Sequence, residues 1–143
     1  MLSLEPLTRS ECLELLAQAS IGRIGLSVAA LPVILPVHFA LDDESILFRA
    51  FPGTKLAAAV TAAIVAFEVD SFESDGSTGW SVLAVGKAEE IIDPSELDRA
   101  NSIHIGRRMV GDGSDHFVRI ETTRLSGRRS LLVADPDSTR KAL

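Results

Sequence analysis

An unbroken alternation of apolar side chains runs through residues 31–41. The odd positions are all apolar, and they are Leu31, Val33, Leu35, Val37, Phe39 and Leu41. Because side chains alternate between the two faces of a strand, this pattern predicts a β-strand with one face against a core. Pro32 and Pro36 on the other face cannot donate ladder hydrogen bonds. We therefore expect backbone irregularities, or an exposed edge where something else could bind.

The segments around this strand predict an antiparallel meander over residues 20–51. A strand at 20–28 precedes it, and the polar turn Asp42-Asp43-Glu44 leads into a strand that includes residues 46–51. Further strands are expected at 63–70, from 79 to about 92, and at 116–125. Six or so strands joined by short links favour a mainly β fold, a small antiparallel barrel with peripheral helices.

Local signals place the helices. Thr8 and Glu11 form a capping box for a helix ending near Gln18, and Asp93 with Pro94 begins another that runs to about His104. A third is expected after Thr54, starting at Lys55.

Composition limits the possible classes of protein. The chain has 143 residues, which suits one domain, here assigned to 1–133 with a fraying tail at 134–143. One cysteine, Cys12, excludes an internal disulfide and a cysteine-rich metal site, so no metal is expected. A net charge of -6 argues against nucleic-acid binding. Without a long apolar run or an export signal, we expect no membrane contact and a cytoplasmic location.

Residues 46–55 contain a candidate anion site. Arg49 lies in an apolar strand, and Pro52-Gly53 ends that strand before Thr54 and Lys55 open the expected helix. Free amides at a helix start, a hydroxyl and two cations together favour a phosphate. The alternative is an exposed Lys55 with Arg49 in a surface ion pair. Signatures of serine hydrolases, phosphate loops, dinucleotide-binding sheets and zinc proteases are absent from the sequence.

Several segments in order resemble the pyridoxamine 5'-phosphate oxidase-like flavin-binding split-barrel proteins. They are PVHFAL at 36–41, ILFRAFPGTKLAAA at 46–59, VAFEVD at 65–70, GWSVLAVGKAEEI at 79–91 and HFVRIETTRLSGRR at 116–129. The resemblance implies a six-stranded antiparallel split barrel of the FMN-binding type. It also implies a homodimer that binds FMN in clefts at the dimer interface.

The resemblance further assigns residues to the cofactor. The ring would be faced by the backbone of Pro36, Val37 and His38, and the ring and ribityl chain would be lined by Arg49 and Ala50. The phosphate would be held by Thr54 and Lys55, and the polar edge or phosphate would be contacted by Trp80 and Ser81. The partner subunit would contribute Arg128 and Arg129.

The expected function is an FMN-dependent oxidoreductase that exchanges hydride with a small substrate at flavin N5. No catalytic residue is assigned, and His38 is the nearest plausible proton donor. Vitamin B6 oxidation is not expected, because the C-terminal tryptophan and arginine-histidine pair of the true oxidases are missing. Alternatives are a deazaflavin-dependent reductase, a non-catalytic flavin or haem protein with His38, His104 or His116 as axial ligand, and a barrel that has lost its cofactor.

Overall fold

A computed structural model describes residues 1–50, 60, 62–106 and 116–134. Its elements in chain order are β1 (Leu2–Pro6), α1 (Arg9–Gln18), β2 (Ile21–Val28), β3 (Leu31–Asp42), β4 (Ser45–Ala50), β5 (Ile64–Phe72), β6 (Gly79–Glu90), α3 (Pro94–Ser102), β7 (His116–Ile120) and β8 (Arg124–Leu132). The helix expected after Thr54 and the end of the expected tail lie outside the described residues. Among those residues, no helix is long and apolar enough to cross a membrane.

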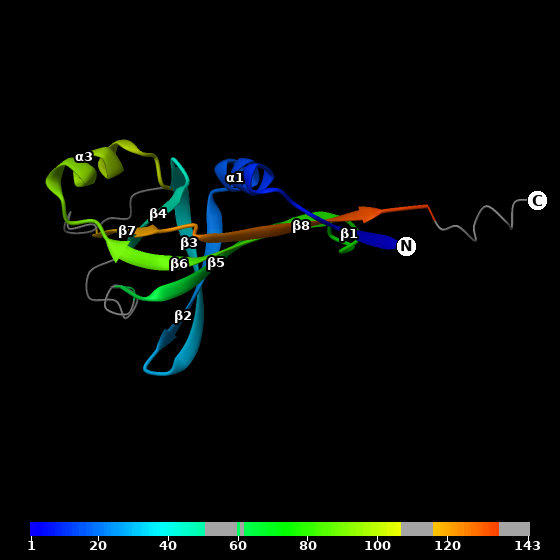
Figure 1. The fold of residues 1–143 in the computed structure, drawn as a ribbon, viewed down its shortest axis with the longest axis horizontal. Coiled ribbons are helices and arrows are strands. Elements are labelled where there is room, and N and C mark those ends of the chain that lie inside the picture. Colours follow the sequence, from blue (N-terminus) through cyan, green and yellow to red (C-terminus); the bar gives the residue numbers. More distant parts are fainter. Residues whose placement is uncertain (51–59, 61, 107–115, 135–143) are drawn as a thin grey trace, which may run out of the picture.

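Six strands close into a barrel. The order is β6-β5-β2-β3-β4-β7, and pairing between β6 and β7 completes the circle. Strands β8 and β1 continue the sheet outside the barrel, with β8 on the first part of β6. All of these pairings are antiparallel. The structure therefore confirms the expected split barrel with peripheral helices (Figure 1).

The inward-facing side chains of the strands fill the barrel. Phe39 and Phe67 meet edge to face inside it, with ring centroids 4.9 Å apart. Cys12 and Leu16 from α1 join the same cluster, so this helix covers part of the core. Both expected helix starts are confirmed, since α1 has the capping box and the side chain of Asp93 caps α3.

A second, smaller cluster lies outside the barrel, around α3. Leu47 from β4 and Phe117 from β7 pack there against Ala100 and Ile105. Alternate residues of β4 therefore face the two clusters, as their period-two spacing predicts. Arg49 shares a face with Leu47 and projects toward this second cluster.

The expectation of a single final strand at 116–125 is wrong. Strand β7 ends at Ile120 and β8 begins at Arg124, although both pair with β6. Ala88 opposes Ile120 and Val85 opposes Arg124, so the segment contains one residue more than β6 over this stretch, as in a β-bulge. The bend crosses β6 at Gly86, where a Cβ would lie 1.8 Å from a backbone oxygen of the bend.

The β2–β3 hairpin projects away from the helices (Figure 1). Within it, Leu31 is 68% exposed and Ile34 is 71% exposed, although they belong to opposite faces of β3. The expected burial of the odd face therefore holds for Phe39 but not for Leu31 and Leu35. The cause is position, because the pairing of β3 with β4 begins only at Phe39, so Leu31 and Leu35 have β2 but not β4 beside them. The hairpin exposes apolar side chains on both faces.

Candidate functional site

A cavity of about 610 Å³ opens beside His38. It lies between the C-terminal end of α1, the second half of β3 and the segment that follows α3. Its described lining is Ala17, Ala19, Ser20, His38, Phe39, Ala40, Leu41, His104 and Gly106. Both imidazoles are on exposed residues. The cavity is therefore a mostly apolar hollow with two groups that can donate or accept a proton.

Arg49 fixes one wall of this cavity. Its Nη1 donates a hydrogen bond to the carbonyl oxygen of Ile105, 3.1 Å away, and its guanidinium carbon lies 5.5 Å from the Phe117 ring centroid. The next residue, Gly106, has φ +56 and packs directly on His38. A Cβ on Gly106 would approach His38 Cγ to 2.8 Å, so only glycine fits at this position.

The expected anion cluster is described only in part. Arg49 lies at the position that the sequence predicts, whereas Thr54 and Lys55 lie outside the described residues. Convergence of these three groups on a phosphate therefore stays a prediction.

Four strands present a continuous outer face, opposite to the barrel core. Register places Pro36, Arg23, Glu68 and Leu83 in one row across β3, β2, β5 and β6. The neighbouring row consists of Ile34, Gly25, Ala66 and Val85. We call these two rows, together with the exposed Ile21 and Ile64 beside them, the outer face. It is largely apolar, and its charged residues Arg23 and Glu68 lie in the middle.

Glu68 is an unusual acid in this setting. Its Oε1 is buried and has no hydrogen-bond partner among the described residues. Burial is the main cause that raises the pKa of Glu68 to about 7, and the neighbouring Asp70 carboxyl raises it further. Arg23 acts in the opposite direction, but its Nη1 lies 3.9 Å from Asp70 Oδ2. With a pKa of about 7, Glu68 is protonated in a large fraction of the molecules near neutral pH.

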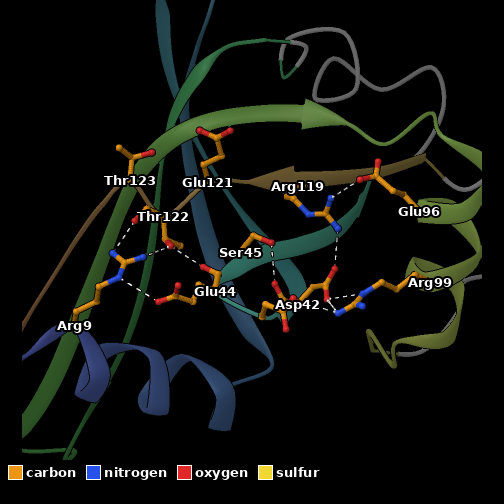
Figure 2. Close-up of a pocket in the computed structure, with 11 residues that line it drawn as sticks. Arg9, Asp42, Glu44, Ser45, Glu96, Arg99, Arg119, Glu121, Thr122 and Thr123 are labelled. Atoms are coloured by element: carbon orange, nitrogen blue, oxygen red, sulfur yellow. Dashed lines mark hydrogen bonds and ion pairs between the residues drawn. The ribbon is translucent and has the colours of Figure 1, made fainter.

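A separate group of charges surrounds Asp42 (Figure 2). Asp42 is buried, and its Oδ1 accepts from Arg99 Nη2 at 2.6 Å while its Oδ2 accepts from Arg119 Nη2 at 2.8 Å. The hydrogen bonds from Arg99 are the main cause that lowers the pKa of Asp42. Nearby, Arg9 binds the carbonyl and hydroxyl oxygens of Thr122. These contacts join α1, α3, β7 and the β3–β4 turn, so we interpret the group as structural.

Comparison with known families decides the identity. A family model described as pyridoxamine 5'-phosphate oxidase matches residues 8–129. The chain belongs to this family. That assignment confirms the resemblance drawn from the sequence blocks.

The similarity to individual known proteins covers most of the chain. The uncharacterized protein Rv0080 of Mycobacterium tuberculosis is 34% identical over 134 residues, which cover 90% of this chain and 86% of the relative. A solved structure of the FAD binding protein from Mycobacterium smegmatis has a TM-score of 0.76 and 32% identity, covering 87% of this chain and 95% of that one. A conserved protein of unknown function from Corynebacterium diphtheriae has a TM-score of 0.77 and 28% identity, covering 90% and 98%.

The predicted cofactor residues of this pyridoxamine 5'-phosphate oxidase family member lie on two faces. Side chains on the outer side of the sheet are those of Pro36, His38, Arg49, Ser81 and Arg128, by register and alternation. On the other side are Val37, Ala50, Trp80 and Arg129. Trp80 packs against the barrel core and Arg129 lies 3.7 Å from Glu11, so these side chains point away from the outer face.

The outer-side residues form two groups. His38 and Arg49 are on adjacent strands β3 and β4, while Ser81 opposes Arg128 in the β6–β8 ladder. Strands β5 and β2 separate the groups, and four inter-strand spacings from β8 to β3 amount to about 19 Å along the sheet. One copy of the chain therefore does not bring all of these residues together.

The sequence analysis missed two features of this region. The first is that His104 shares the cavity with His38; the two residues come from distant segments, and no local pattern connects them. The second is the pair Glu68 and Asp70, which a local pattern could have indicated, since carboxylates two residues apart share one face of a strand. The third histidine, His116, is paired with Glu90. Among the described residues, no group of three or more His, Cys, Asp or Glu could hold a metal ion.

Proposed function

We propose that this protein binds a flavin, with FMN as the expected form, at a site shared between two copies of the chain. We propose further that it is an FMN-dependent oxidoreductase acting on a small substrate. The observation that carries this proposal is the division of the candidate residues. His38 and Arg49 lie on β3 and β4, whereas Arg128 lies on β8, about 19 Å from β3 along the sheet, with Ser81 one strand nearer on β6. A second copy would bring the two groups together.

The residues present fit a planar ligand with an anionic tail. Pro36 and the apolar row beginning at Ile34 offer a flat surface of the kind that a ring system covers. The guanidinium of Arg128 is exposed beside Ser81 and can bind a phosphate with charge-assisted hydrogen bonds. Thr54 and Lys55 are expected to complete the phosphate site from the adjoining segment.

A bound flavin would supply hydride exchange at its N5 atom. The chain would supply orientation and a proton. His38 lines a cavity of about 610 Å³, which offers room for a small substrate, and its imidazole is the candidate proton donor. The contact with Gly106 would hold this ring in place.

FAD is the second candidate cofactor, because the Mycobacterium smegmatis relative at 32% identity is named an FAD binding protein. The two flavins share the isoalloxazine ring and first phosphate, so both would use the contacts described above. A deazaflavin or haem would give a different absorption spectrum.

The test is an absorption spectrum of the purified protein, followed by titration with FMN and FAD. Flavin bands, and reduction of the bound flavin by a nicotinamide nucleotide, are expected. Arg128→Gln should weaken FMN affinity about tenfold, through loss of one charge-assisted contact. Arg124→Gln is the matched control, because Arg124 is also exposed on β8 and shares a face with Arg128, but opposes Val85.

Failure to bind either flavin would overturn the proposal. A Soret band or deazaflavin bands in its place would assign the alternative cofactor. Flavin binding without reduction by any donor would leave a non-catalytic flavin protein and remove the enzymatic part.

A further inference from the structure

The cavity beside His38 contains a second imidazole, that of His104, which the proposed function does not use. Ile103 and Ile105, on either side of His104, pack into the smaller cluster around α3, and Ile105 is buried. His104 lies between them and lines the cavity instead. The two histidines therefore line one hollow from two segments, β3 and the segment after α3.

The walls around the two imidazoles are small and apolar. Ala17 and Ala19 contribute from the end of α1, and Ala40 contributes from β3. The backbone N–H of Phe39 donates a hydrogen bond to the carbonyl oxygen of Ser20, 3.0 Å away, so the link after α1 is attached to β3. Both helices lie away from the β2–β3 hairpin (Figure 1). Since a cavity of about 150 Å³ can hold benzene, this hollow has room for a molecule of one or two rings.

Charge limits what this cavity can bind. Among its described lining residues there is no Asp, Glu, Lys or Arg. An ion that leaves water for these walls would lose hydration without gaining a partner of opposite charge. The net charge of -6 on the chain adds repulsion for anions in particular. The cavity therefore favours a neutral molecule over its charged analogues.

The two imidazoles supply the polar contacts. A neutral imidazole has one hydrogen-bond donor and one acceptor, so the pair can bind a carbonyl oxygen and an N–H or O–H group of the same ligand. We propose that the cavity between His38 and His104 binds a small, neutral, largely apolar molecule with such a polar group, for example a carboxamide, and that His104 is its second polar contact. That this molecule is the substrate rests on the proposed function, whereas the binding itself does not.

Three probes of similar shape test the preference for a neutral ligand. Benzamide is neutral, benzoate is an anion and benzylamine is a cation. Each is titrated into the full chain as purified, and the ring resonances of His38 and His104 are followed by NMR. Benzamide should shift both sets of resonances and bind at least about tenfold more tightly than either ion. No shift with benzamide, or equal affinities for benzamide and benzoate, would overturn the proposal.

Three variants test the position of the site. Ala17→Phe should fill the cavity from an exposed position on α1 and abolish benzamide binding. His104→Ala should weaken binding about fivefold through loss of one hydrogen bond, whereas His104→Gln, which keeps a donor and an acceptor, should bind nearly as tightly as wild type. His116→Ala is the matched control, because His116 is outside the cavity lining and pairs with Glu90. Wild-type affinity in Ala17→Phe or His104→Ala would overturn this site.

Titration of the same samples with FMN is a separate readout. Flavin binding by a chain that does not prefer benzamide would overturn this inference and leave the proposed function in place. Selective benzamide binding by a chain that binds no flavin would overturn the proposed function and support the ligand site.

Discussion

Arg49 donates a hydrogen bond from Nη1 to the carbonyl oxygen of Ile105, 3.1 Å away, across the interface between β4 and the segment after α3. This contact gives Arg49 a structural role in addition to the expected role at the cofactor. Gly106 follows Ile105 and packs on His38, so the position of the Arg49 side chain affects the position of the His38 ring through this segment. A substitution of Arg49 should therefore change the environment of His38.

Arg49→Lys should separate the guanidinium geometry from the positive charge. Lysine keeps the charge but loses the planar group that lies 5.5 Å from the Phe117 ring centroid. We expect a loss of about 1–2 kcal/mol in the free energy of unfolding, measured by urea denaturation. The His38 ring resonances should also shift in the NMR spectrum. Arg124→Lys on the exposed part of β8 is the control, and equal effects of the two changes would contradict this role.

Gly106→Ala should disturb His38 directly. The change adds a Cβ that would lie 2.8 Å from His38 Cγ, at a residue whose φ is +56. Gly76→Ala is a matched control, because Gly76 has φ +72 but nothing within 4 Å of the added atom. Backbone strain of about 1–2 kcal/mol is common to both. Denaturation should find Gly106→Ala the less stable of the two, and only this variant should move the His38 resonances.

Local signals in the sequence were sufficient for the helices and for most strands. The capping box at Thr8 and the Asp93-Pro94 start correctly predicted both described helices, because these signals act within one turn. The alternation of apolar residues correctly predicted β3 and β4, because side chains at every second position of a strand face the barrel interior. The short strand β1 escaped prediction, since it lies at an edge and exposes most of its residues.

Features that depend on register were not predictable in the same way. The break between β7 and β8 follows from one extra residue opposite β6, and Gly86 alone does not reveal which backbone crosses it. The exposure of Leu31 follows from how far the hairpin projects beyond the barrel. The cavity between His38 and His104 requires the tertiary path of the chain.

Asp42→Asn should destabilise the fold, because two guanidiniums lose their common carboxylate. We expect a loss of about 2–4 kcal/mol at pH 7 by urea denaturation. Arg99→Ala should cost less, since Arg99 is 57% exposed and Asp42 would keep Arg119. The pKa of Asp42 is lowered, so its contribution is complete above its ordinary pKa and is lost as pH falls through the lower value in the folded state. The variant and wild type should therefore converge in strong acid, and a constant difference would contradict the assignment.

Glu68→Gln should stabilise the protein, and the gain should depend on pH. Burial raises the pKa of Glu68 to about 7 in the folded state, so between its ordinary pKa and pH 7 the folded chain keeps a proton that the unfolded chain has released. Stability of the wild type should thus fall as pH rises through this range and then level off above pH 7. Glutamine removes this titration, so the gain in melting temperature should be near zero at pH 4 and largest at pH 8. Glu14→Gln, which changes an exposed carboxylate on α1, is the matched control and should give no such trend. Thermal melts at low protein concentration check this, and a gain that stays constant from pH 4 to 8 would mean that Glu68 titrates normally in the folded chain.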